Sequence, residues 1–205
     1  LASMEDGPRI FLSSSAIGIY GDRGSAELTE ASAASDDRGN FLVSVVEAWE
    51  EAAAPAAAAG IRTVLLRTGI VLDEDGGALG RMLLPFKLGI GGRLGSGRQW
   101  WSWISLEDEV RAITHLLDSE LAGPVNLTAP HPVTNRDFTS ALGRVLQRPT
   151  VFPVPRAALD VYLGRERAGA LAFTSARVMP ARLLDDGFQF THAELEAALE
   201  DLFAD

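Results

Sequence analysis

Three consecutive serines follow an apolar run near the start of the 205-residue chain, and their hydroxyls are groups that could bind or polarise a ligand. The run Ile10-Phe11-Leu12 is short and continuous, as a strand buried on both faces of a parallel sheet would be. Ser13-Ser14-Ser15 follow it directly, and Tyr20-Gly21 come five residues later. Pockets in parallel sheets lie beyond the carboxyl ends of the strands. The segment therefore predicts either a ligand-binding strand end or an ordinary strand that runs into a loop.

Arginines supply a second set of groups that could bind a ligand. Arg67 ends another apolar run and is followed by Thr68-Gly69. A buried arginine needs a partner, which here is either a core carboxylate or a phosphate group of a ligand. Arg93 and Arg98 flank a glycine-rich segment. They could hold a diphosphate through paired hydrogen bonds, or they could be solvated surface residues.

Aromatic residues are grouped in the middle of the chain. Successive side chains of a strand point to opposite faces, and this spacing is seen in Trp100, Trp101 and Trp103. At least one of these rings is expected in the core, which leaves another to line a pocket. Trp49 stands at helical spacing and is expected in the core. His131, between two prolines, is expected in a loop without a chemical role.

Composition excludes several classes of function. A formal net charge of −10 argues against nucleic acid or an anionic membrane as a partner, because both need a basic surface. The chain has no cysteine, which excludes disulfide and thiolate chemistry, and its three histidines show no metal-ligand spacing. No apolar run reaches 18 residues, so we expect a soluble, cytoplasmic protein without a bound metal, whose partner is a small-molecule substrate.

The elements that must position these residues alternate between strand and helix. Parallel strands are expected at 9–14, 62–67 and 124–128. A helix is expected over Asn40–Ala59, capped by Asp36 or Asp37 and ended by Gly60, and Pro55 should kink it or mark a late break. Its apolar face is expected to be formed by Phe41, Val45, Ala48, Trp49 and Ala52. Further helices are expected at about 78–88, after the caps Ser105, Thr134 and Thr191, and around Ala158 and Ala170.

Several motifs together resemble one family. Ser-Ser-Ser-x-x-x-x-Tyr-Gly at Ser13–Gly21 is similar to the serine strand of extended short-chain dehydrogenases/reductases, the sugar-nucleotide epimerase group. Further matches to this family follow in order at Arg67–Leu72, Trp103–Asp108 and Gly123–Asn126. The tail from Arg177 to Phe190 looks like the branch of epimerase-like or cell-division-inhibitor-like proteins.

The resemblance implies an α/β fold, a partial Rossmann-like parallel sheet with a smaller C-terminal substrate lobe. Residues 1–76 would form the second half of the nucleotide-binding domain, to which the strand at 124–128 returns, and 77–205 mainly the substrate lobe. The chain contains no Gly-x-Gly-x-x-Gly, so the family's first four strands and glycine loop are expected to be absent from it. NAD or NADP would then bind to the full-length protein but hardly to this chain alone. A homodimer through 40–59 is expected by analogy.

The family's site residues carry over as follows. Ser15 is the candidate catalytic residue, because the family's last serine hydrogen-bonds the reacting hydroxyl or carbonyl. The resemblance assigns cofactor binding to Ser13, Ser14, Arg67, Thr68, Gly69 and Ile70. Substrate binding is expected of five other residues: Tyr20, Arg93, Arg98, Gln99 and Trp103.

One departure concerns the chemistry. The family's acid/base pair, Tyr-x-x-x-Lys, aligns with Phe41 and Val45, neither of which can exchange a proton. The chain is therefore expected to be an NAD(P)-dependent nucleotide-sugar epimerase or reductase-like protein without that pair, or a non-catalytic nucleotide-binding or regulatory protein on the same scaffold. A hydrolase that uses Ser15 is disfavoured, because no Gly-x-Ser-x-Gly is present.

Overall fold

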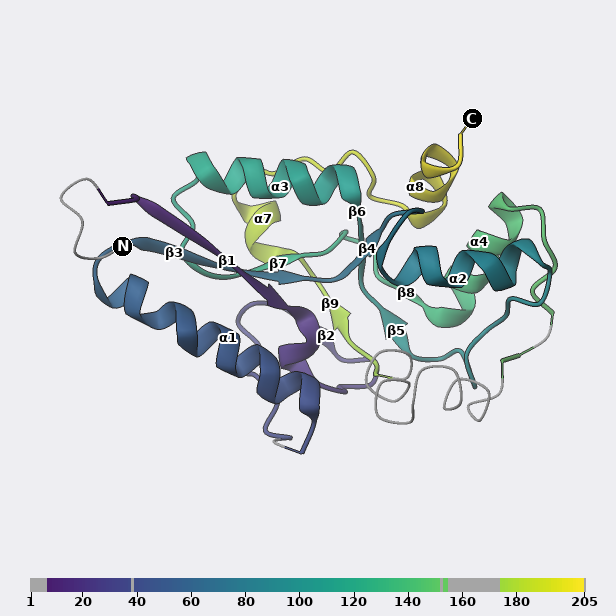
Figure 1. Ribbon diagram of the computed structural model, residues 1–205, viewed down its shortest axis with the longest axis horizontal. Helices are drawn as coiled ribbons and strands as arrows, with labels where there is room; N and C mark the ends of the chain where they lie inside the picture. Colours follow the sequence, from purple (N-terminus) through teal and green to yellow (C-terminus); the bar gives the residue numbers. More distant parts are fainter. Residues whose placement is uncertain (1–6, 38, 152, 155–173, 205) are drawn as a thin grey trace.

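The computed structural model describes residues 7–37, 39–151, 153–154 and 174–204 (Figure 1). The helical segments expected around Ala158 and Ala170 lie outside these residues. Among the described residues, no helix combines the length and the apolar character needed to cross a membrane.

A parallel sheet of three strands forms the centre of the first half of the molecule. Its strands are β1 (Ile10–Ala16), β3 (Arg62–Thr68) and β7 (Gly123–Leu127), in the order β1-β3-β7. The three predicted strands are confirmed, with ends shifted by at most two residues. Ala16 pairs with Thr68, so the carboxyl ends of β1 and β3 lie side by side.

Helices cover the sheet on both faces (Figure 1). On one face lies α1 (Phe41–Ala58), because its Glu50 side chain bonds Arg67 of β3. On the other face lies α3 (Leu106–Asp118), where Leu116 packs in one buried cluster with Val64. Alternate residues of β3 therefore face the two helices, as the period of two in a strand requires.

The boundaries of α1 follow from its flanking residues. Asn40 is the N-cap, and its side-chain oxygen accepts a hydrogen bond of 3.0 Å from the backbone N–H two residues later. The prediction of Asp36 or Asp37 as the cap was wrong, because the helix begins closer to Asn40. Pro55 does not end the helix, which continues to residue 58. Gly60 follows with a φ of +82°, the left-handed conformation expected after a helix end.

The predicted apolar face of α1 was also wrong. Val43, Val46 and Ala53 are the buried residues of the helix. Phe41 is 70% exposed and Trp49 49% exposed, so Trp49 is not a core residue. The small residues face the sheet, where Glu50 needs room to reach Arg67, and the bulky aromatic residues point away from it. The homodimer expected through this helix stays a prediction.

Three helices pack at the end of the molecule toward which β1 points (Figure 1): α2 (Gly77–Lys87), α4 (Asn135–Val145) and α8 (Leu195–Leu202). Trp101 and Trp103 are buried in a core cluster with residues of these helices. The short strand pairs are β4 (Ile70–Leu72) with β6 (Trp103–Ser105), β5 (Trp100–Trp101) with β8 (Val133–Thr134), and β9 (Arg177–Val178) with β2 (Glu27–Leu28). The short helix α7 (Ala181–Asp185) lies instead against the central sheet, where Leu183 shares a buried cluster with Val64.

The predicted caps of the later helices have mixed outcomes. Ser105 and Thr134 accept hydrogen bonds from the backbone of α3 and α4, which confirms both caps. Thr191 does not cap α8, whose N-cap is Glu194. The Thr191 hydroxyl instead donates to Glu107 on α3.

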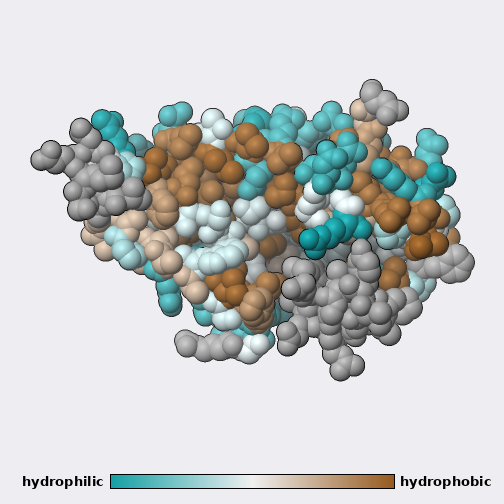
Figure 2. All heavy atoms as spheres, in the orientation of Figure 1, coloured by the Kyte–Doolittle hydropathy of each residue, from teal (hydrophilic) through white to brown (hydrophobic). Residues whose placement is uncertain are grey.

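Apolar surface extends along α3 on the face shown in Figure 2. Leu106, Val110 and Leu117 of this helix are between 46% and 55% exposed. These residues leave the outer side of α3 without an apolar partner in the described part of the chain.

Gly69 is required by the crossing between β3 and β4. A Cβ at this position would lie 2.6 Å from the Ser102 carbonyl oxygen and 3.0 Å from a Thr128 methyl carbon. We expect Gly69→Ala to lower the unfolding free energy by about 1–3 kcal/mol, because backbone must move to relieve the clash. Gly18→Ala is the control, since its Cβ would make an ordinary contact of 3.6 Å with Leu42. Equal urea midpoints for the two variants would contradict this packing.

Candidate functional site

A buried ion pair lies beneath the carboxyl ends of the sheet strands. Arg67 of β3 donates from Nε to Oε1 of Glu50 at 2.8 Å and from Nη2 to Oε2 at 2.9 Å. The side chains are 8% and 15% exposed. Two parallel hydrogen bonds between a guanidinium and a carboxylate are the strongest form of such a pair. Of the two partners that the sequence left open for Arg67, the structure shows the core carboxylate.

Three further side chains complete this network. Arg67 Nη1 donates to the Tyr20 hydroxyl oxygen at 3.0 Å, and the Tyr20 hydroxyl donates to Asn126 Oδ1 at 2.8 Å. Ser15 Oγ donates to Glu50 Oε1 at 2.6 Å. The network therefore joins all three strands of the central sheet to α1 and to the 3-10 helix η1 (Ile17–Tyr20).

Burial and hydrogen bonds set the protonation states in the network. Burial alone would raise the pKa of Glu50, but hydrogen bonds from Arg67 and Ser15 outweigh it and hold this pKa below its usual value. Burial would lower the pKa of Arg67, but its bonds to Glu50 and Tyr20 raise it. The pKa of Tyr20 is raised, mainly by burial. At neutral pH the network contains one positive and one negative charge in direct contact, and a neutral phenol that accepts a hydrogen bond from the positive one.

These bonds limit what the network can do to a ligand. The Ser15 hydrogen is donated to Glu50, so Ser15 Oγ retains only acceptor capacity in this arrangement. Tyr20 is fully buried and uses its hydroxyl as both donor and acceptor. Ser13 is half-buried and Ser14 is exposed. The roles predicted for these residues stay predictions, and Ser14 offers the most accessible hydroxyl of the three serines.

A second buried carboxyl lies on the opposite face of the sheet. Thr68, the last residue of β3, has its Oγ1 2.9 Å from Oε1 of Glu109 on α3. Glu109 is 9% exposed, and its Oε2 has no hydrogen-bond partner. Burial raises the pKa of Glu109 to about 7, and the Thr68 hydroxyl offsets only part of that effect.

Sequence analysis missed Glu109, although a signal for it exists. Ala112 and Leu116 lie three and seven residues after it and are both fully buried. Residues at these spacings share one face of a helix. Glu109 therefore had to face the core, where a carboxyl group is rare and costly.

The backbone N–H groups of Gly69 and Ile70 are hydrogen-bonded within the protein. Gly69 N–H donates to the Leu127 carbonyl at 3.0 Å, and Ile70 N–H donates to the Ser102 carbonyl at 2.8 Å. The cofactor contacts predicted for Gly69 and Ile70 stay predictions, with the Ile70 side chain half-buried.

The predicted substrate residues of the second half lie in the loop before β5 and at the start of β6. Gln99 is buried and donates to the Leu94 carbonyl, and the buried Trp103 ring donates to the His131 carbonyl. Arg93 donates to two carbonyls of its own loop. Arg98 is exposed beside a hollow of about 270 Å³. The structure thus brings Ser13–Ser15, Tyr20 and 67–70 together, and of the second group it places Trp103 beside Ile70, its partner in the β4–β6 pair.

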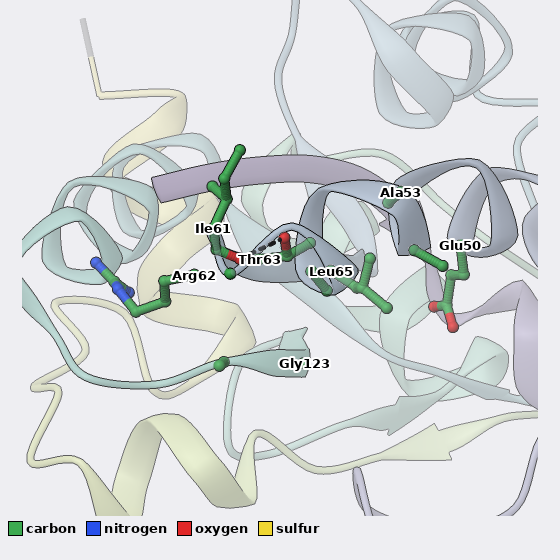
Figure 3. Close-up of a pocket in the computed structure, with 11 residues that line it drawn as sticks. Glu50, Ala53, Ile61, Arg62, Thr63, Leu65 and Gly123 are labelled. Atoms are coloured by element: carbon green, nitrogen blue, oxygen red, sulfur yellow. Dashed lines mark hydrogen bonds between the residues drawn. The ribbon is translucent and has the colours of Figure 1, made fainter. Parts of the chain in front are cut away.

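A larger hollow of about 550 Å³ lies between α1 and β3 (Figure 3). Alanines of α1, including Ala53, line it together with Ile61, Thr63 and Leu65. The Thr63 hydroxyl already donates to the Ile61 carbonyl, and Glu50 at one end is bound to Arg67. This hollow therefore offers little free chemistry.

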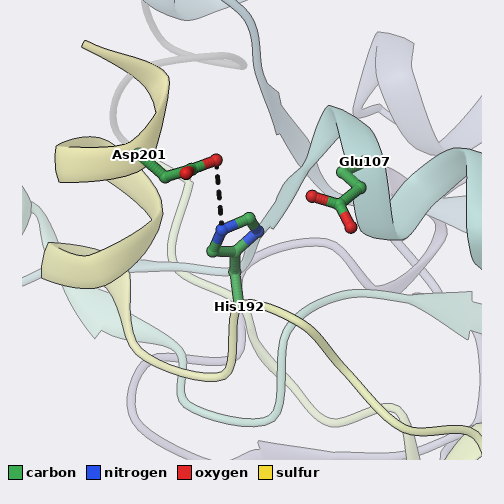
Figure 4. Close-up of side chains that lie close together, drawn as sticks. All are labelled: Glu107, His192 and Asp201. Atoms are coloured by element: carbon green, nitrogen blue, oxygen red, sulfur yellow. Dashed lines mark ion pairs between the residues drawn. The ribbon is translucent and has the colours of Figure 1, made fainter. Parts of the chain in front are cut away.

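Glu107, His192 and Asp201 lie close together near α8 (Figure 4). Their nearest nitrogen and oxygen atoms are within 4.8 Å of one another, and His192 Nε2 is 3.5 Å from Asp201 Oδ2. The other ring nitrogen of His192 is 3.1 Å from Ser105 Oγ, and Glu107 accepts from a threonine hydroxyl. Each of the three groups thus has a protein partner, and the contacts of Glu107 and His192 connect the C-terminal segment to α3 and its N-cap.

Comparisons with known proteins point to one family. Epimerase family protein ML0860 of Mycobacterium leprae is 43% identical over 201 residues, which are 97% of this chain and 64% of that protein. Bovine epimerase family protein SDR39U1 is 37% identical over 206 residues, covering 100% of this chain and 69% of that protein. A model described as a domain of unknown function, DUF1731, matches residues 154–202.

A solved structure agrees with these relatives. The crystal structure of human epimerase family protein SDR39U1 (isoform 2) with NADPH superposes with a TM-score of 0.87 at 34% identity. The match covers 98% of this chain and 67% of the human one. The chain therefore spans about two thirds of the length of the relatives it matches.

The free energy of unfolding should fall as the pH rises toward neutrality, because Glu109 loses its proton. Its pKa is about 7 in the folded state against an ordinary value of 4.5, so the folded state binds the proton more tightly. Between these pH values the unfolding free energy should fall by up to about 3 kcal/mol. Glu109→Gln should remove this slope, while the acid-side loss from Glu50 remains in both proteins. Parallel curves of stability against pH for wild type and variant would contradict the assignment.

Proposed function

The chain belongs to the epimerase family of extended short-chain dehydrogenases/reductases, and on this basis we propose that it is part of an NAD(P)-dependent, epimerase-like oxidoreductase acting on a nucleotide-linked sugar. The observation that most supports NAD(P) binding is the close superposition on the human relative crystallised with NADPH. Bound nicotinamide supplies a centre that accepts or donates hydride.

The strand ends fit a ligand of this kind. Parallel β1 and β3 end side by side, and Ser14 and Thr68 present hydroxyls at this edge. Ser14 is exposed and Thr68 half-buried, so both can reach a polar ligand. In this proposal the Arg67–Glu50 pair holds the two strand ends in place, and the ligand contacts come from Ser13, Ser14 and residues 68–70.

The domain division follows from the same proposal. Residues 1–76 and β7 would form the nucleotide side, and residues 77–205 the substrate side. Arg98 supports this division, since it is an exposed cation beside a hollow and could face an anionic group of the substrate.

One observation favours a second candidate, a nucleotide-binding protein without turnover. Phe41 and Val45 occupy the positions that the family resemblance gives to the acid/base pair. The hydrogens of Ser15 and Tyr20 are donated within the buried network. Neither hydroxyl can give a proton to a substrate without breaking these bonds.

Cofactor binding can be tested with the full-length protein. Calorimetric titration should give micromolar or tighter affinity for NADH or NADPH. Ser14→Asp should weaken this affinity at least tenfold, because a carboxylate at the strand end repels an anionic dinucleotide. Ser44→Asp makes the same charge change at an exposed position of α1 and should leave the affinity unchanged.

Absence of binding for both dinucleotides would overturn the proposal. If binding is found, turnover assays with nucleotide-linked sugars separate the two candidates. Turnover that is lost in Ser15→Ala favours the enzyme, whereas tight binding without turnover favours the nucleotide-binding protein.

A further inference from the structure

The Thr68 hydroxyl at the end of β3 lies near two acceptors. Its Oγ1 is 2.9 Å from Glu109 Oε1 and 3.4 Å from the Leu66 carbonyl oxygen. A hydroxyl carries one hydrogen and can donate to only one of them at a time. Both contacts are satisfied together if Glu109 carries a proton of its own and donates it to Thr68 Oγ1. The second carboxyl oxygen has no partner, which a neutral carboxyl tolerates better than a buried carboxylate.

Neighbouring charges on α3 are directed elsewhere. Glu107 accepts a hydrogen bond from the Thr191 hydroxyl at 3.0 Å. Asp108 forms an ion pair of 2.7 Å with Arg111. The Arg111 guanidinium is therefore held by Asp108 and not by Glu109.

The elements packed around Glu109 bring no counter-charge either. The sequences of β1, β4, β6 and β7 contain no titratable side chain. The titratable groups of β3, of the later part of α3 and of the segment from α7 to α8 that face this side have other partners: Arg62, His115, Arg182, Asp186 and His192. Arg67 faces α1 on the opposite side of the sheet, where it pairs with Glu50. Within the described residues, Glu109 is therefore paired only with Thr68, and burial raises its pKa to about 7.

We propose that Glu109 is a positioning residue that donates a hydrogen bond to Thr68 Oγ1, so that the Thr68 hydrogen is not held by Glu109 and can turn from the distant Leu66 carbonyl to an acceptor oxygen of a ligand at the carboxyl end of β3. The inference deepens the proposed function, on which its ligand rests: a dinucleotide that offers amide or phosphate oxygens. Thr68 is half-buried, so its hydroxyl can be reached from the strand end.

Loss of the proton reverses the hydrogen bond. The ionised Glu109 can only accept, so Thr68 must donate to it and presents only lone pairs to the ligand. A negative charge then also lies one hydrogen bond away from an anionic ligand. Binding should therefore weaken as the pH rises through neutrality.

The test is calorimetric titration of the full-length protein with NADPH and NADH at pH 6.0 and pH 8.5. Wild-type affinity should fall about tenfold between these values, the loss of one good hydrogen bond. Glu109→Gln keeps a donor toward Thr68 and should bind equally at both values. Thr68→Val should bind weakly and without pH dependence, and Thr68→Ser should restore the wild-type profile.

Superimposable pH profiles for wild type and Glu109→Gln would overturn the inference. If neither dinucleotide binds at pH 6.0, the proposed function fails, and a carbon-13 NMR titration of the Glu109 carboxyl decides the inference alone. A midpoint near 7 that changes in Thr68→Val supports the proton-holding role. A midpoint near 4.5, or one insensitive to Thr68→Val, overturns it.

Discussion

The bidentate ion pair between Arg67 and Glu50 is the interaction on which the arrangement of the strand ends depends. A charged arginine in a central strand cannot be buried without compensation. Glu50 supplies the opposite charge from α1, and it fixes the helix against the sheet by doing so. Tyr20 extends the pair to β7 through Asn126, and Ser15 extends it to β1. One polar network thus holds together elements that are far apart in the sequence.

The residues of this network support the strand ends, and we assign contact with the ligand to other residues. Ser15 faces α1 at the end of its strand and donates its hydroxyl hydrogen to Glu50, so this hydrogen is not available to a ligand. Ser14 on β1 is exposed, and the half-buried Thr68 on β3 shares its hydroxyl with Glu109, so these two hydroxyls are among the ligand contacts that we propose.

Apolar runs in the sequence were sufficient to predict the parallel strands, because a strand buried on both faces has few alternatives. The face of α1 was mispredicted, since Phe41 and Trp49 have helical spacing but point outward, while the buried face contains only small residues and Glu50. Because this face of α1 was mispredicted, the sequence showed that Arg67 needs a partner but did not identify Glu50 as that partner. Glu109 was missed because carboxyl groups are rarely buried, so a glutamate on a helix is expected at the surface. Only its contact with Thr68 accounts for its position in the core.

A double-mutant cycle across Arg67 and Glu50, measured by urea unfolding at pH 7, tests the central claim most directly. Arg67→Met and Glu50→Leu should each lower the unfolding free energy by about 3–5 kcal/mol, because each leaves an uncompensated buried charge. The double variant should be destabilised by much less than the sum, since both charges are then removed together. Effects that add to within about 0.5 kcal/mol would contradict the account, because they would show that the two side chains do not depend on each other.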